Sequence, residues 1–206
     1  MRSFDQETFF ADLRELGITS SVDVFDQLAI AYSEPTRHYH TQCHITDCLQ
    51  LLDRLGHLAE CPAAIAIAIW FHDAVYNPRR TDNEALSARW ASEYLTSAGV
   101  APSLVASISD MILATKTHAS ANSDTDIMLD IDLSILGADS EHFETYDRAI
   151  RQEYAWVPEA DYRAVRRNLL SSFLTRDMIF KTQAFRQRYE HQARENLQHK
   201  VLQLSA

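Results

Sequence analysis

Hydrophobic residues recur at helical spacing along almost the whole chain, with polar residues between them. In residues 4–16 the apolar side chains fall on one face of a helix, because positions three and four apart share a face. The same pattern predicts further helices at 21–32, 37–55, 62–76, 81–99, 102–118, 126–138, 140–157, 159–174, 176–185 and 186–204. We therefore expect about nine to eleven helices.

Residues that begin and end helices agree with this division. Ser20 or Ser21 is a suitable N-cap for the second helix, and Pro62 and Pro102 suit first helical positions. Gly99 suits a helix C-terminus. The chain has only four glycines and five prolines. So few helix breakers favour long helices and argue against a β fold with many turns.

Residues 126–133 are ambiguous, because apolar and acidic residues alternate there as in a strand. A lone strand would have no pairing partner. We predict one all-α domain over 1–206, a helical bundle with its core at about 35–140 and the N-terminal and C-terminal helices packed on it. The amphipathic segment 192–204 either packs on the domain or pairs with a second copy in a homodimer.

Composition and charge narrow the class of protein. The formal net charge of −10 disfavours a general nucleic-acid binder, while a small phosphorylated ligand remains compatible with it. Three cysteines are an odd number, and no Cys-x-x-Cys pair occurs, so a disulfide framework is not expected. The longest apolar run, 63–71, is about half of a membrane span. We expect a cytoplasmic protein with no membrane partner.

Histidines are concentrated in "EPTRHYHTQCHITD", where His40 and His44 lie four residues apart. On a helix both would project from one face. The alternative is a pair of surface histidines. Further along, His72 and Asp73 end an apolar helix, where burial is costly without a compensating partner such as a metal ion. The alternative there is a polar helix end that faces water.

Two acids interrupt the apolar segment "MLDIDLSILG". Asp130 could cap a helix or act as a ligand, whereas Asp132 is harder to explain without a ligand role. In chain order, His44, then the pair His72–Asp73, then Asp132 form the pattern His…His-Asp…Asp.

With this pattern the chain resembles the HD superfamily of metal-dependent phosphohydrolases. More narrowly, it is similar to a bacterial family of predicted HD-type phosphohydrolases that has no assigned substrate. The closer likeness runs from about Pro35 to Leu197 and rests on "PTRHYHTQCHI", "WFHDAVYNP", "DNEALSA", "DIDLSILG", "IRQEYAWVP" and "FLTRDMIF…ARENL".

The resemblance implies that His44, His72, Asp73 and Asp132 bind a divalent metal ion. Two imidazoles and two carboxylates suit Mn²⁺, Fe²⁺, Zn²⁺, Co²⁺ or Ni²⁺, and they also accept Mg²⁺. "YHTQCH" further resembles the Tyr-His-x-x-x-His segment of cyclic nucleotide phosphodiesterases. By that likeness His44 is the ligand and His40 the proton donor; spacing alone does not separate the two.

Charged residues near these motifs are candidates for substrate binding. Arg37 and Lys116 could hold a phosphoryl group. Glu84 could complement a helix dipole or face the metal cleft, and Tyr76 could line a nucleobase pocket. His118 is a candidate ligand for a second metal, as in some HD proteins, or a solvated loop residue.

The expected reaction is hydrolysis of a phosphate ester or anhydride in a nucleotide or another small phosphorylated metabolite. A metal-bound water would attack, Asp73 would take its proton, and His40 would protonate the leaving oxygen. Two alternatives stay open. One is an HD-fold di-iron oxygenase, and the other is a non-enzymatic regulatory or binding module that contains the metal.

Overall fold

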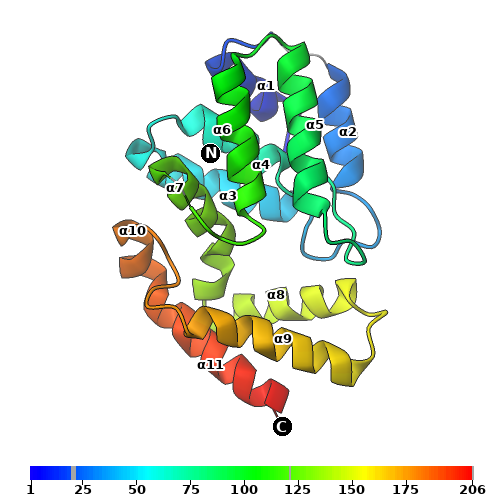
Figure 1. Cartoon of the computed structure of the whole chain (residues 1–206), viewed down its shortest axis with the longest axis vertical. Coiled ribbons are helices and arrows are strands. Elements are labelled where there is room, and N and C mark those ends of the chain that lie inside the picture. Colours follow the sequence, from blue (N-terminus) through cyan, green and yellow to red (C-terminus); the bar gives the residue numbers. More distant parts are fainter. Residues whose placement is uncertain (20–21, 121, 206) are drawn as a thin grey trace. The chain divides into compact units, whose positions relative to one another are not determined.

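The computed structural model describes residues 1–19, 22–120 and 122–205 (Figure 1). Within these ranges all regular elements are helical and no strand occurs. The predicted all-α fold with nine to eleven helices is confirmed. The chain divides into two compact units, Met1–Ile131 and Asp132–Ala206. Whether all elements form the predicted single domain stays a prediction.

Seven α-helices and one 3₁₀ turn are found in the described part of the first unit. The last helix, α7, ends with Asp132 at the unit boundary. The elements are α1 (Gln6–Glu15), α2 (Val22–Ala31), α3 (Gln42–Leu55), η1 (Gly56–Leu58), α4 (Pro62–Phe71), α5 (Asn83–Ser97), α6 (Pro102–Ala114) and α7 (Ser123–Asp132).

Helix α4 is the centre of the first unit, because it contacts α1, α3, α5 and α6. Residues 63–71 are buried on every side, which explains why this helix is apolar all round. The Trp70 ring lies 4.9 Å from the Phe4 ring and 5.2 Å from the Phe9 ring between centroids.

No helix of the described residues is both long and apolar enough to cross a membrane. The cytoplasmic location stays a prediction.

Most helix boundaries follow the predicted signals. Pro62 and Pro102 occupy first helical positions, and Gly99 follows α5 with φ +79°. The predicted cap of α2, Ser20 or Ser21, lies outside the described residues. Residues 126–132 belong to α7, so the helical interpretation of the ambiguous segment is confirmed.

The predicted helix at 37–55 is too long. The structure begins α3 at Gln42, because Thr41 adopts an extended backbone (φ −117°, ψ 179°) and its hydroxyl accepts from the Cys43 N–H. His40 therefore precedes the helix instead of sharing a helical face with His44. Short polar residues such as threonine favour this capping position over a helix interior.

In its described residues the second unit contains η2 (Leu133–Gly137), α8 (Ser140–Glu153), α9 (Glu159–Leu174), α10 (Gln183–Phe185), the π-helical turn η3 (Arg186–Glu190) and α11 (His191–Ser205). Helix α11 packs against α9 and η2, as Figure 1 shows in orange to red for α9 and α11. Pairing of the C-terminal helix with a second copy stays a prediction.

Buried charged side chains of the second unit form ion pairs. The Lys200 ammonium lies 2.6 Å from Glu144 and 3.2 Å from Asp147, and Arg166 lies 3.0 Å from the same Asp147. Charged groups at such burial need partners of this kind.

Gly137 lets the backbone of η2 approach Tyr189 closely, because a Cβ at this position would lie 2.6 Å from the Tyr189 backbone oxygen.

The predicted helix at 176–185 is wrong for most of its length, since only Gln183–Phe185 are helical there. Side chains from η3 and α11 hold residues 176–182 in an irregular conformation. Glu190 accepts from the backbone N–H groups of Ile179 and Phe180. Arg194 donates to the carbonyls of Arg176 and Asp177. These contacts replace the hydrogen bonds that a helix would provide.

Candidate metal centre

Three side chains that lie far apart in sequence meet at one point. His44 is in the first turn of α3, His72 directly follows α4, and Asp132 is the last residue of α7. One ligand atom of each lies within 4.8 Å of the others. Both imidazoles are buried and the carboxylate is half-buried. Convergence of two imidazoles and a carboxylate is a common donor set for divalent transition metals.

Asp73, the fourth predicted ligand, lies beside the two imidazoles. Its Oδ2 is 3.1 Å from His72 Nε2 and 3.7 Å from His44 Nε2, and the two Nε2 atoms are 3.2 Å apart. Atoms bound to one ion at about 2.1 Å lie about 3.0 Å apart at octahedral angles and about 3.4 Å apart at tetrahedral angles. The spacing of these three atoms therefore fits a shared cation.

The orientation of the His72 ring is fixed by the helix that carries it. Its Nδ1 lies 2.8 Å from the carbonyl oxygen of Ile69, which only accepts hydrogen bonds. The proton of a neutral imidazole therefore belongs on Nδ1, and Nε2 presents its lone pair toward His44 and Asp73. The Cys48 sulfur packs 3.8 Å from each ring nitrogen of His44.

The charge balance favours an anionic Asp73. Burial raises the pKa of this carboxyl group, but the positive charge of the nearby His72, His40 and His44 imidazoles, when they are protonated, lowers it by a larger amount. The net pKa lies well below the ordinary value. A carboxylate that is ionised among imidazoles matches the ligand chemistry of divalent cations.

His40, the predicted proton donor, lies at the edge of this cluster. Its ring stacks on Tyr76 with centroids 4.0 Å apart and an interplanar angle of 26°, and it lies 6.1 Å from the His44 ring. The structure thus brings together the predicted catalytic histidine and the predicted substrate-pocket tyrosine. Both side chains are partly exposed.

Arg37 has contacts that the sequence did not predict. Its side chain is 1% exposed, and its guanidinium donates to the backbone carbonyls of His40, Asp73 and Ala74 and to the Glu34 carboxylate. Four of its N–H donors therefore have protein acceptors. Binding of substrate by Arg37 stays a prediction.

Lys116 and Glu84 form an ion pair at 3.7 Å, and the Lys116 ammonium also donates to the Thr81 carbonyl. Glu84 lies in the first turn of α5, where it complements the helix dipole. His118, in the loop after α6, is the one non-glycine residue with positive φ (54°) in the described chain. The cluster of three ligands does not include His118.

Asp130 lies inside α7 and is fully buried. A capping role at a helix N-terminus is therefore wrong for this residue, since seven helical residues precede it in Ser123–Asp132.

Residues that the sequence analysis missed include Cys48, which touches His44, and Ile69, which orients His72. Both lie one helical turn from their histidine, so helical spacing was the signal that could have found them.

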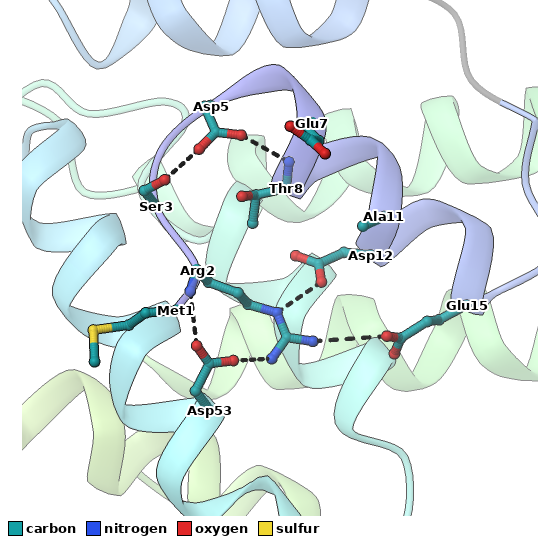
Figure 2. Close-up of a pocket in the computed structure, with 10 residues that line it drawn as sticks. All are labelled: Met1, Arg2, Ser3, Asp5, Glu7, Thr8, Ala11, Asp12, Glu15 and Asp53. Atoms are coloured by element: carbon teal, nitrogen blue, oxygen red, sulfur yellow. Dashed lines mark hydrogen bonds and ion pairs between the residues drawn. The ribbon is translucent and has the colours of Figure 1, made fainter.

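A second polar cluster lies at the N-terminus, around a hollow of about 430 Å³ that α1 and α3 line (Figure 2). Arg2 lies 2.8 Å from Asp12 and 2.6 Å from Asp53. Asp12 also accepts from the Trp70 indole at 2.8 Å. Burial raises the pKa of Asp12 despite these partners. None of the predicted ligands lines this hollow. The contacts of Arg2 and Asp12 connect α1 to α3 and α4.

Comparison with known proteins finds no family model, no curated protein and no solved structure that matches the chain. The geometry of the cluster and the chemistry of its donors are therefore the basis for an interpretation of function.

Proposed function

We propose that this chain is a metal-dependent phosphohydrolase of the HD type. The observation that carries the proposal is the convergence of His44 from α3, His72 from the end of α4 and Asp132 from α7, with the Asp73 carboxylate beside the two imidazoles. The donor atoms of His44, His72 and Asp73 have the spacing of ligands around one cation, and His72 has the second hydrogen bond that metal-binding histidines usually make. The same residues form the pattern by which the sequence resembles HD phosphohydrolases.

A bound divalent cation supplies charge neutralisation for phosphoryl oxygens and lowers the pKa of a water molecule. The side chains of this chain would do the remaining work. Asp73 would accept the proton of the attacking water, because its carboxylate lies beside the two imidazoles of the proposed site. His40 donates a proton to the leaving oxygen, and its stacking on Tyr76 fixes the ring that must deliver it.

A nucleotide or another small phosphorylated metabolite is the proposed substrate class. Tyr76 is partly exposed and stacks on His40, and Lys116 offers a partly exposed ammonium that Glu84 holds. These groups would contact the parts of a substrate beyond the phosphoryl group. The net charge of −10 favours a small ligand over a nucleic-acid polymer.

Elemental analysis of the purified protein, followed by a phosphate-release screen, tests the proposal. The protein is supplied with Mn²⁺ and incubated with a panel of nucleotides and phosphorylated metabolites. We expect about one equivalent or more of bound transition metal and release of phosphate from at least one class. His44→Ala should lose both.

The matched control is His57→Ala, because His57 is an exposed histidine in η1, directly after the same helix. This variant should keep the metal and the activity. Bound iron without phosphate release would favour the oxygenase instead. Bound metal with neither activity would favour the binding module, and absence of metal from the protein contradicts all three.

A further inference from the structure

The chain segment that follows the buried helix α4 contains Asp73 and has no regular structure of its own beyond a turn. Its backbone polar groups are held by side chains. The Arg37 guanidinium donates to the carbonyl of Asp73 at 2.6 Å and to that of Ala74 at 3.0 Å. Arg37 Nη1, the nitrogen that donates to Asp73, also donates to the His40 carbonyl at 3.3 Å.

Helix α5 holds the rest of this segment. The buried Ser87 hydroxyl accepts from the Val75 N–H at 3.0 Å and donates to the Val75 carbonyl at 3.3 Å. Asn83 makes the same pair of contacts one turn earlier, since its amide accepts from the Asn77 N–H at 3.1 Å and donates to the Asn77 carbonyl at 2.9 Å. Three side chains thus anchor residues 73, 74, 75 and 77.

Aromatic rings limit the movement of the Arg37 guanidinium. Its central carbon lies 5.2 Å from the Tyr32 ring centroid and 5.6 Å from that of Tyr76. Tyr32 is itself buried and donates to the Trp70 carbonyl. The planar guanidinium lies near two aromatic rings and donates hydrogen bonds to backbone carbonyls. A lysine ammonium cannot reproduce this combination of contacts.

We propose that Arg37 is a positioning residue, which with Ser87 and Asn83 clamps residues 73–77 so that Asp73 and His40 face the same metal ion. The inference rests on the proposed metal site. It differs from the prediction that Arg37 binds a phosphoryl group, because the side chain is 1% exposed and four of its five N–H donors have protein acceptors. The clamp joins the loop before α3, which carries His40, to the turn after α4, which carries Asp73.

Arg37→Lys tests the clamp, with Arg151→Lys as the matched control. Arg151 has a similar but smaller set of contacts in the second unit: a glutamate at Nε, two backbone carbonyls and one tyrosine ring. Two measurements are made on the full chain. Hydrogen exchange of the metal-free protein measures how fast the backbone amides of residues 73–77 exchange. Titration with Co²⁺ measures the affinity for the ion and the visible spectrum of the bound ion.

We expect Arg37→Lys to speed exchange in residues 73–77, to weaken Co²⁺ binding by about 10- to 100-fold, and to change the Co²⁺ spectrum at saturation. Arg151→Lys should change none of these. Unchanged affinity and spectrum in folded Arg37→Lys overturn the proposal, and so does equal weakening by both variants. If Arg37→Lys does not fold, Ser87→Ala takes its place, and wild-type Co²⁺ binding by that variant overturns the proposal.

The same data separate this inference from the proposed function. A wild-type protein that binds no Co²⁺ contradicts the metal site and hence the phosphohydrolase, while exchange in the metal-free protein still decides whether the clamp exists. A hydrolase whose Arg37→Lys variant keeps its Co²⁺ affinity and spectrum but shows a raised KM retains the proposed function. That result assigns Arg37 to the substrate.

Discussion

Replacement of His72 by alanine should uncouple the stability of the protein from divalent metal. In the wild type, a cation that binds only the folded chain stabilises it by about 2.7 kcal/mol at 100 times its dissociation constant. For a chain of this size each kcal/mol moves Tm by about 2–4 °C. Saturating Mn²⁺ should therefore raise the wild-type Tm by about 5–11 °C.

The variant removes the Nε2 atom that lies 3.2 Å from His44 Nε2 and 3.1 Å from Asp73 Oδ2. The proposed site therefore loses one of its ligand atoms. We expect no Mn²⁺-dependent rise in Tm. The substitution has a separate structural cost, because the Ile69 carbonyl loses its contact with Nδ1. An unpaired buried acceptor costs about 1–3 kcal/mol, which lowers Tm in the absence of metal.

Thermal unfolding is followed with Mn²⁺ and with EDTA, and the difference between the two Tm values is compared among variants. This difference cancels the structural cost, which both conditions share. His57→Ala, an exposed histidine in η1, should keep the wild-type difference. A His72→Ala protein with the wild-type difference would refute the assignment of His72 as a ligand.

Three further results are expected. His40→Ala should keep the metal and lose about 10²- to 10⁴-fold in kcat; loss of metal from this variant, measured by elemental analysis, would contradict the assignment. Gly137→Ala should destabilise the chain by about 1–3 kcal/mol in urea unfolding, since the new Cβ meets Tyr189 at 2.6 Å; wild-type stability would refute the close approach. Burial raises the pKa of Tyr162 to about 12, so the folded chain keeps a proton that the unfolded chain loses at about pH 10. The free energy of unfolding should fall between those values, and Tyr162→Phe should lose this part of the pH dependence.

The sequence was sufficient to predict the class of fold, and three of the four predicted metal ligands lie in one cluster. The apolar run 63–71 is uniform because α4 is buried on all sides, and that burial makes His72 and Asp73 stand out at its end. His44 and Asp132 were identified by resemblance to a family pattern. Their meeting with His72 depends on the packing of three helices, which one-dimensional spacing does not encode.

Local signals failed where side chains from elsewhere determine the backbone. His40 was placed on a helix because apolar and polar residues around it continue the helical pattern, but the Thr41 cap begins α3 after it. Residues 176–182 were expected to be helical, and Glu190 and Arg194 hold them otherwise. The role of Arg37 is of the same kind, since its acceptors at Asp73 and Ala74 are 36 and 37 residues away.

The burial of α4 on every side also bears on which ions the cluster could accept. An imidazole at the end of a helix that four neighbours enclose has little freedom to retreat, because protein interiors are densely packed and resist displacement. Ca²⁺ needs bonds of about 2.3–2.6 Å and six to eight oxygen atoms, which this frame does not offer. The two imidazoles at this enclosed helix end would thus favour a transition metal ion over Ca²⁺.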